Sequence, residues 1–262
     1  MRSAISIGVR PRAGPDAVSI LILIIAVFIT AFISGVFGMA GGLILMGVLA
    51  MILPVSAAMV VHGVVQAVSN GWRAILLGKW IDWRILGVYL TGSAMAATVL
   101  FFAAFQLPKP WLFIVLGLVP AVIWIPQDWL RLDAGNPVQA VICGFLVTGL
   151  NTVAGVSGPL VDVFFVAAPR DRRIIVATKA ATQVVSHLVK IAYYVTPAMA
   201  AGALPQTHWL LIAGPLAIIG TTLGARLLEV MSDVQFRNWT KWIVTGIGAI
   251  YVLRGALLLT GI

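Results

Sequence analysis

Two sets of polar side chains recur at helical spacing inside apolar stretches, and they are the residues best suited to chemistry. The first set is His62, Gln66, Ser69, Asn70 and Arg73, and the second is Lys179, Gln183, Ser186, His187 and Lys190. Steps of three or four residues place each set on one face of an α-helix. Cations, amides and hydroxyls bind anions well, and the nearby spans add one carboxylate, Asp162. We therefore predict two polar helix faces that bind a small anion.

A glycine-rich segment precedes each polar stripe. Residues 37–42 read Phe-Gly-Met-Ala-Gly-Gly, and residues 154–159 read Ala-Gly-Val-Ser-Gly-Pro. Glycine tolerates a positive φ and proline lacks an amide donor, so both segments are predicted to break a helix and free backbone N–H groups. The residues assigned to binding here are Gly38, Gly41, Gly42, Gly155, Ser157 and Gly158. The alternative is that these glycines only let helices pack closely.

The two halves of the chain repeat each other at an offset of 117 residues, without a gap. The matched pairs are Gly38 and Gly155, Gly41 and Gly158, Leu43 and Leu160, Ala50 and Ala167, Gln66 and Gln183, Val68 and Val185, and Ser69 and Ser186. Internal duplication of a membrane unit is typical of transporters, in which both copies contribute to one central site.

The composition places the chain in a membrane. Hydrophobic residues make up 61% of the sequence, charged residues only 10%, and the mean hydropathy is +1.07. The net charge of +9 comes from scattered basic residues, which fits orientation in a bilayer better than a nucleic-acid surface. A single cysteine, Cys143, excludes an internal disulfide. We expect an integral membrane protein with no metal, no cofactor and no nucleic-acid partner.

Apolar runs predict ten transmembrane segments in an all-α fold. The first five are 17–35, 41–53 (short), 55–77, 85–105 and 111–125. The second five are 137–152, 156–168 (short), 174–195, 209–228 and 242–260. The expected organisation is an N-terminal extension at 1–16, a first repeat at 17–125, a connecting loop at 126–136 and a second repeat at 137–262. An alternative interpretation treats the first apolar run as a signal peptide.

The basic residues outside the predicted spans bear on the topology. If all ten segments cross the membrane, nine of the thirteen lie on one face and four on the other, whereas returning hairpins at the short segments give seven and six. The positive-inside rule favours ten crossings with both termini outside. Five crossings per half invert the second repeat relative to the first, which predicts a site near mid-bilayer and alternating access.

Each ionisable group inside the predicted spans can be interpreted in two ways. Lys179 and Asp162 form either a structural pair or a site for a coupling proton, and His187 is either a packing residue or a proton carrier. Arg73 and Lys190 are either site residues or side chains that extend to the interface. A charge at the centre of a span costs about 2.5–3.5 kcal/mol on insertion scales, so each one needs a partner, water or a ligand.

The sequence resembles the TauE/SafE sulfite exporter family of four-toluene sulfonate uptake permease-like membrane transporters. The resemblance rests on the paired glycine joints, on Asp171-Arg172-Arg173, and on the run at 176–190 that contains Ala-Thr-Lys-Ala-Ala-Thr-Gln and Ser-His. It implies secondary transport of sulfite, sulfoacetate or another organosulfonate, coupled to protons, in a bacterial inner membrane. Ala40 and Ser157 stand where the family has glycines.

Other functional classes make different predictions. A passive anion channel or a permease for a non-sulfur carboxylate would share the cationic, glycine-rich interior. A membrane scaffold would not need matched polar stripes. The sequence contains no HExxH, no GxSxG and no paired aspartates within spans, so the usual intramembrane enzyme sites are absent. The exact substrate, the direction of transport and the oligomeric state do not follow from the sequence.

Overall fold

The computed structural model describes residues 17–37, 39–126, 132–166, 171–205, 207–230 and 232–261, and regular structure in these residues is helical throughout. In chain order the elements are α1 (Ala17–Phe37), α2 (Met39–Ile52), α3 (Val55–Leu76), η1 (Gly78–Trp80), α4 (Trp83–Ala103), α5 (Lys109–Leu118), η2 (Val119–Trp124), α6 (Pro137–Ala154), α7 (Gly158–Val166), α8 (Arg172–Ala200), α9 (Thr207–Val230) and α10 (Asp233–Leu259).

Four helical segments are long and apolar enough to cross a membrane by length and composition. They are Trp83–Ala103, Pro137–Ala154, Arg172–Ala200 and Asn238–Leu259. Shorter apolar helical segments are Leu21–Phe37, Met39–Ile52, Lys109–Trp124 and Leu211–Leu227. Many large apolar side chains are exposed, as expected where lipid replaces water at the surface. The predicted all-α membrane class is confirmed.

Each predicted apolar segment coincides with a helix, but some boundaries differ. The fifth segment changes from α-helix to 3₁₀-helix at Val119, where Pro120 has no N–H for the α-helical bond. α8 continues five residues past the predicted end, through Pro197 to Ala200. α10 begins at Asp233 instead of 242, because its first turns are polar and do not belong to the apolar run.

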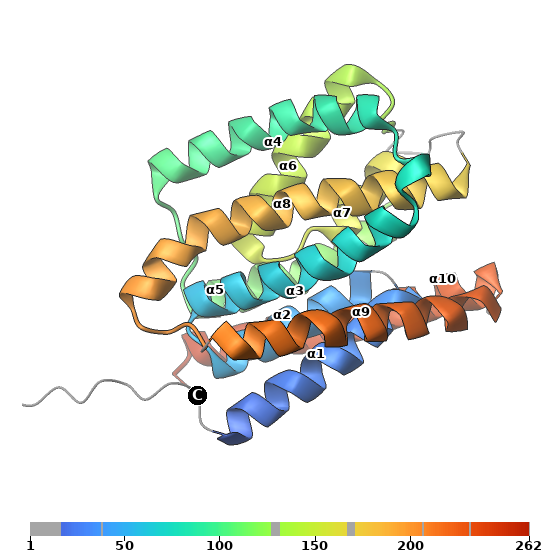
Figure 1. Ribbon diagram of the computed structural model, residues 1–262. Helices are drawn as coiled ribbons and strands as arrows, with labels where there is room; N and C mark the ends of the chain where they lie inside the picture. The colour runs from blue at the N-terminus through green and yellow to red at the C-terminus, as the bar shows by residue number, and fades with distance from the viewer. Residues whose placement is uncertain are drawn as a thin grey trace, which may run out of the picture.

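Helix pairs in the bundle combine the two predicted repeats. α3 and α8 lie side by side through the middle, α4 packs against α6, and α1 packs against α9 (Figure 1). α5 packs against α10. Each of these pairs joins one helix from before residue 126 with one from after residue 136. The halves therefore interdigitate, and the central pair α3 and α8 is the pair that carries the two polar stripes.

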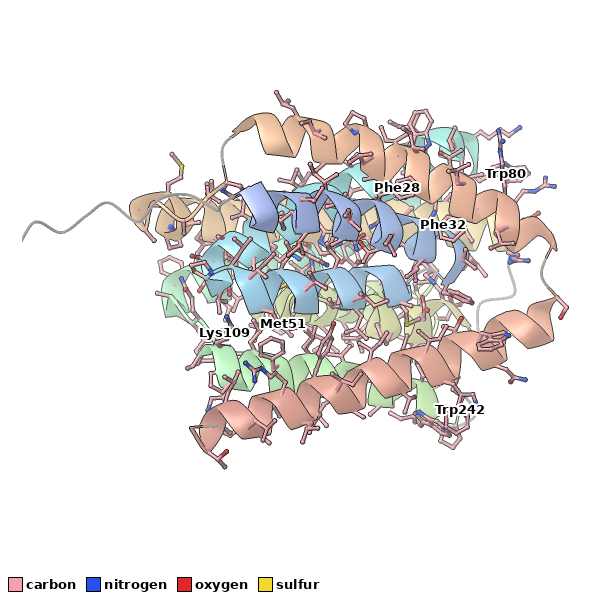
Figure 2. The ribbon with its side chains drawn as sticks, turned by 90° about the horizontal axis from the view of Figure 1, so that it is seen from below. Phe28, Phe32, Met51, Trp80, Lys109 and Trp242 are labelled. Atoms are coloured by element: carbon pink, nitrogen blue, oxygen red, sulfur yellow. The ribbon has the colours of Figure 1, made fainter. Side chains whose placement is uncertain are left out.

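Small residues allow the outer pairs to approach closely. A Cβ added at Gly92 of α4 would collide with the backbone of α6 at Val141, and one at Gly144 of α6 would collide with α4 at Tyr89. In the other pair, Gly220 and Gly224 of α9 lie against the α1 backbone at Phe28 and Phe32, whose side chains Figure 2 labels. These contacts follow the general use of small residues where membrane helices cross.

Local capping positions three of the helices. The side chain of Asp82 accepts hydrogen bonds from the amides of Arg84 and Ile85 at the start of α4. Asn136 begins α6 in the same way, and Asp171 accepts from the amide of Arg173 at 2.7 Å to begin α8. Such side chains satisfy N–H groups that a helix leaves unpaired in its first turn. The beginning of α8, which carries the second stripe, is thereby fixed.

The bundle has two distinct ends. Trp80 lies at one end, while Lys109 and Met51 lie together toward the other (Figure 2). Arg173 lies over the Trp80 ring at 5.1 Å from its centroid, and Lys79 at 5.6 Å. Lys109 donates to the Met51 carbonyl at 3.3 Å, which places a cation at the C-terminal end of α2. Arg2, Arg10, Arg12, Arg131 and Arg170 lie outside the described residues.

Candidate functional site

The chain leaves the helical path between α6 and α7. α6 ends at Ala154, and its C-cap residue is Gly155, whose φ is 87° and whose amide donates to the Asn151 carbonyl at 2.9 Å. Val156 and Ser157 are not helical, and α7 begins at Gly158. In the first half, α1 ends at Phe37 and α2 begins at Met39, and Gly38 lies outside the described residues. Only glycine adopts the Gly155 conformation at low cost.

The N-termini of the two short helices meet. A Cβ added at Gly158, the first residue of α7, would lie 2.6 Å from the Cβ of Met39, the first residue of α2. Gly155 packs against the side chains of Met46 and Met59. Helix N-termini carry unpaired N–H groups and a partial positive charge, which favour an anion nearby.

Lys190 is the central cation of the arrangement. Its side chain on α8 is fully buried. The ammonium nitrogen lies 2.7 Å from Nδ1 of His62 on α3 and donates to the Gly155 carbonyl at 2.8 Å. The interpretation of Lys190 as a side chain that extends to the interface is therefore wrong, because the head group bonds to the helix break and to the partner helix.

Two histidines flank this ammonium group. Nε2 of His62 lies 3.0 Å from the carbonyl oxygen of Gly42 on α2. The His62 and His187 rings pack edge to face with centroids 5.6 Å apart. Nδ1 of His187 lies 3.2 Å from the amide nitrogen of Asn151 on α6. The cluster thus connects α2, α3, α6 and α8, and it draws on both halves of the chain.

Several buried polar atoms of α6, of α8 and of the break between α6 and α7 have unused hydrogen-bonding capacity. Among the described residues, Nε2 of Gln183, Oγ of Ser157 and Oδ1 of Asn151 are buried without a hydrogen-bond partner. Gln66 is buried too, and its amide group lies against Gly42. Buried polar groups normally have partners, so the unsatisfied hydroxyl of Ser157, which lies in the helix break itself, indicates a place for a polar ligand.

Ser186 faces a different set of side chains. Its hydroxyl lies 3.3 Å from the Tyr89 hydroxyl, which lies 3.3 Å from Thr148, and Thr148 lies 2.7 Å from Ser93. Tyr89, Ser93, Thr148 and Asn151 are not among the residues predicted from the sequence. Thr148 and Asn151 could have been found, because they lie seven and four residues before Gly155 on one helical face and interrupt an apolar run.

The remaining predicted residues have other partners. Arg73 donates to the Ser34 carbonyl at 3.3 Å, and Asn70 donates to the Gln66 carbonyl at 2.9 Å. Lys179 is ion-paired with Asp162 of α7, which is the contact that the sequence predicted. Ser69 is buried. A Cβ added at Gly41 would collide with α1 at Thr30. Gly41 is therefore packed against α1 and does not face the cluster.

The chemistry available to the cluster is binding of an anion. Lys190 contacts an imidazole nitrogen and a backbone carbonyl oxygen, and in the described part of the chain no carboxylate contacts it. The same residues contain no group of three His, Cys, Asp or Glu side chains able to hold a metal. A buried ammonium without a counter-charge is costly, and an anionic ligand would remove that cost.

A bundle of apolar helices with an unwound joint and a buried cationic cluster at its centre defines a membrane transporter. The sulfite exporter TauE/SafE family matches residues 23–251, and the chain belongs to this family. The family consists of transporters and not of enzymes.

A curated relative supports the same class. The chain is 28% identical over 171 residues to the probable inner membrane transporter protein TsaS of Comamonas testosteroni. The alignment covers 61% of this chain and 68% of that protein. No solved structure matches the chain.

Proposed function

We propose that the protein is a secondary transporter of a small sulfur-containing anion, namely sulfite, sulfoacetate or another organosulfonate. The observation that carries the proposal is the environment of Lys190. An ammonium has three donors, and Lys190 uses two, on His62 and on the Gly155 carbonyl. The third donor and the positive charge are left for an anion. Membership of the sulfite exporter family supports sulfur chemistry in that anion.

The binding site is assigned to both halves. Gly42, Gln66 and His62 contribute from the first half, and Gly155, Ser157, Gly158, Gln183, His187 and Lys190 contribute from the second. Unpaired donors at Gln183 and Ser157 match the oxygen-rich surface of a sulfonate or sulfite. Ser69, Asn70, Arg73 and Ser186 complete the proposed polar faces, and Gly38 belongs to the first joint.

Alternating access between two inverted five-helix repeats is proposed for the transport cycle. At the offset of 117 residues, α1 corresponds to α6 and α9 corresponds to α4. The contact of α1 with α9 is thus the counterpart of the contact of α6 with α4, while α3 with α8 pairs counterparts directly. α5 and α10, the fifth α-helices of the two halves, also pack together. This exchange of partners is what a two-fold pseudo-symmetric pair of repeats produces. Rocking of one repeat against the other would expose the central site alternately.

A bacterial inner membrane is the proposed location, with both termini outside. The description of TsaS as a probable inner membrane transporter supports the location. The positions of Trp80 and Lys109 at opposite ends of the bundle support a crossing by α4 between them (Figure 2). Proton coupling is also proposed, and the candidates from the sequence are Asp162, Lys179 and His187.

Uptake into proteoliposomes tests the proposal. With purified protein and labelled sulfoacetate, we expect saturable uptake that an inward proton gradient accelerates and that unlabelled sulfite inhibits. Lactate at the same concentration should not compete. Flux that does not saturate and ignores the proton gradient would favour a passive anion channel, and equal competition by lactate would favour a carboxylate permease.

Two variants connect this assay to the site. Lys190→Met removes the buried charge and should abolish saturable uptake, while Lys79→Met removes an exposed lysine from the end of the bundle and should not. Uptake by Lys190→Met at the wild-type rate would exclude the central ammonium from the site. Size-exclusion chromatography of both variants separates loss of function from loss of fold.

A further inference from the structure

The contacts of Lys190 and His62 restrict where their protons lie. Two backbone carbonyl oxygens, those of Gly42 and Gly155, face the pair at 3.0 and 2.8 Å, and a carbonyl can only accept. Nε2 of His62 must therefore carry a proton that points at Gly42. One N–H of Lys190 must likewise point at Gly155. The contact between Nζ of Lys190 and Nδ1 of His62, at 2.7 Å, is the only one of the three whose proton is not assigned by its partner.

One proton between Nζ of Lys190 and Nδ1 of His62 completes this hydrogen bond in either of two positions. An ammonium at Lys190 donates to a neutral imidazole, or an imidazolium at His62 donates to a neutral amine. The proton crosses between the two nitrogens while the bonds to Gly42 and Gly155 remain, so no heavy atom has to move. In both arrangements the pair holds one positive charge.

The same contacts also tolerate loss of the charge. A neutral amine keeps two N–H groups, which donate to Nδ1 of His62 and to the Gly155 carbonyl, so every hydrogen bond of the pair survives. What disappears is the third donor of Lys190 and the positive charge, which are the two features that attract an anion. The protonated pair is therefore the anion-binding form. The neutral pair is the form that can be buried in an apolar interior without the cost of an unpaired charge.

The other ionisable groups around α3 and α8 have different partners. His187 is engaged with Asn151, Lys179 pairs with Asp162 of α7, and Arg73 donates to the Ser34 carbonyl. The remaining ionisable side chains on the described parts of α8 and on the elements packed against it or against α3 are Arg172, Arg173, Tyr193, Tyr194, Arg84 and Tyr89 on α4, Cys143 on α6, Lys79 on η1 and Arg226 on α9. In these residues no carboxylate contacts the pair, so its charge has no resident partner.

We propose that Lys190 and His62 share one proton that binds and leaves together with the transported anion. This inference rests on the proposed function and names the coupling site within it. It assigns coupling to the contact between the two halves, and not to Asp162, Lys179 or His187. A monovalent anion and one proton then move in the same direction as a neutral pair, which removes the cost of carrying net charge through the membrane. By linkage, the anion should raise the proton affinity of the pair as much as the proton raises anion affinity.

Proton uptake on anion binding tests this assignment. Methanesulfonate is a suitable probe because it stays ionised throughout the working pH range, so any proton taken up belongs to the protein. In weakly buffered detergent solution with a pH-indicator dye, wild-type protein should take up one proton per bound methanesulfonate at a pH where the free pair is neutral. The apparent affinity for methanesulfonate should fall about tenfold for each unit by which the pH rises in that range. Binding without proton uptake in the wild type would overturn the inference.

Lys190→Arg keeps the positive charge but cannot release a proton, because arginine remains protonated in proteins. This variant should bind methanesulfonate with a pH-independent affinity and take up no proton, and Lys79→Arg at the exposed end should match the wild type. His62→Gln leaves Lys190 as the titrating group, so binding should stay coupled to a proton but over a pH range different from that of the wild type. Proton uptake that persists in Lys190→Arg, or an unchanged pH range in His62→Gln, would overturn the inference, even if transport is intact.

Two kinds of failure are distinguishable in these measurements. Saturable, pH-independent binding of methanesulfonate would contradict the shared proton while preserving the proposed transporter. Absence of binding to methanesulfonate, sulfoacetate and sulfite alike would contradict the proposed function and, with it, the coupling site.

Discussion

Asp162 on α7 and Lys179 on α8 form an ion pair that ties the short helix to the beginning of the second polar stripe. Both side chains remain partly accessible, at 28% and 27% of their full exposure. The pair is therefore a partly exposed contact, whereas Lys190 at the other end of the stripe is fully buried.

Removal of either partner of this pair should lower stability modestly. Partly exposed ion pairs contribute about 0.2–1 kcal/mol, so Asp162→Asn and Lys179→Met should each reduce the thermal unfolding temperature by only a few degrees. The double variant should lose less than the sum of the two, because the interaction can be lost only once. Strict additivity in a double-mutant cycle, measured by thermal shift, would show that the two groups do not interact.

Cysteine labelling should find residues 79 and 109 on opposite sides of the membrane. α4 occupies residues 83–103 between them, and Trp80 and Lys109 lie at opposite ends of the bundle (Figure 2). Lys79→Cys and Lys109→Cys would be treated in intact vesicles with a membrane-impermeant maleimide, and only one of the two should react before the membrane is opened. The native Cys143 is buried and gives a low background. Labelling of both from one side would contradict the ten-crossing topology.

Gly92→Ala should destabilise the contact between α4 and α6. The added methyl group would collide with the backbone of Val141 and Phe145, which flexible side chains cannot relieve. Overpacking of this kind costs about 1–3 kcal/mol. Gly149→Ala on α6 is the matched control, because nothing lies within 4 Å of its added Cβ. Thermal shift should show a clear loss for Gly92→Ala and no loss for Gly149→Ala, and equal behaviour would count against a tight crossing of α4 and α6.

Substitution of Gln66 and Gln183 together by Leu should abolish anion flux in proteoliposomes and leave expression intact. The two amides occupy equivalent positions in the halves, and leucine fills similar space without a donor or acceptor. Because Nε2 of Gln183 has no partner in the described structure, its removal leaves no broken bond behind. Thr98→Val changes an exposed hydroxyl on α4 and serves as the control. Unimpaired flux in the double variant would remove both glutamines from the site.

The sequence does not show which glycines of a motif pack against another helix and which face the binding site. Gly41 and Gly42 are neighbours in one motif, yet a Cβ at Gly41 would strike α1, while one at Gly42 would meet Gln66 and His62. Adjacent positions on a helix point about 100° apart, so the answer depends on which helices lie on each side. The same reason explains why Ser186, which belongs to the stripe by spacing, contacts the Tyr89 hydroxyl instead of Lys190.

The sequence by itself determined the membrane class, the ten helical segments and the two polar stripes, because composition and local periodicity are properties of a few neighbouring residues. It also predicted a break at Gly155, since glycine there permits the left-handed conformation. Only the tertiary structure decided that Lys190 meets His62 and the Gly155 carbonyl, 128 and 35 residues away along the chain. Such contacts depend on the relative positions of α3, α6 and α8, and helix packing, which involves the whole bundle, sets those positions.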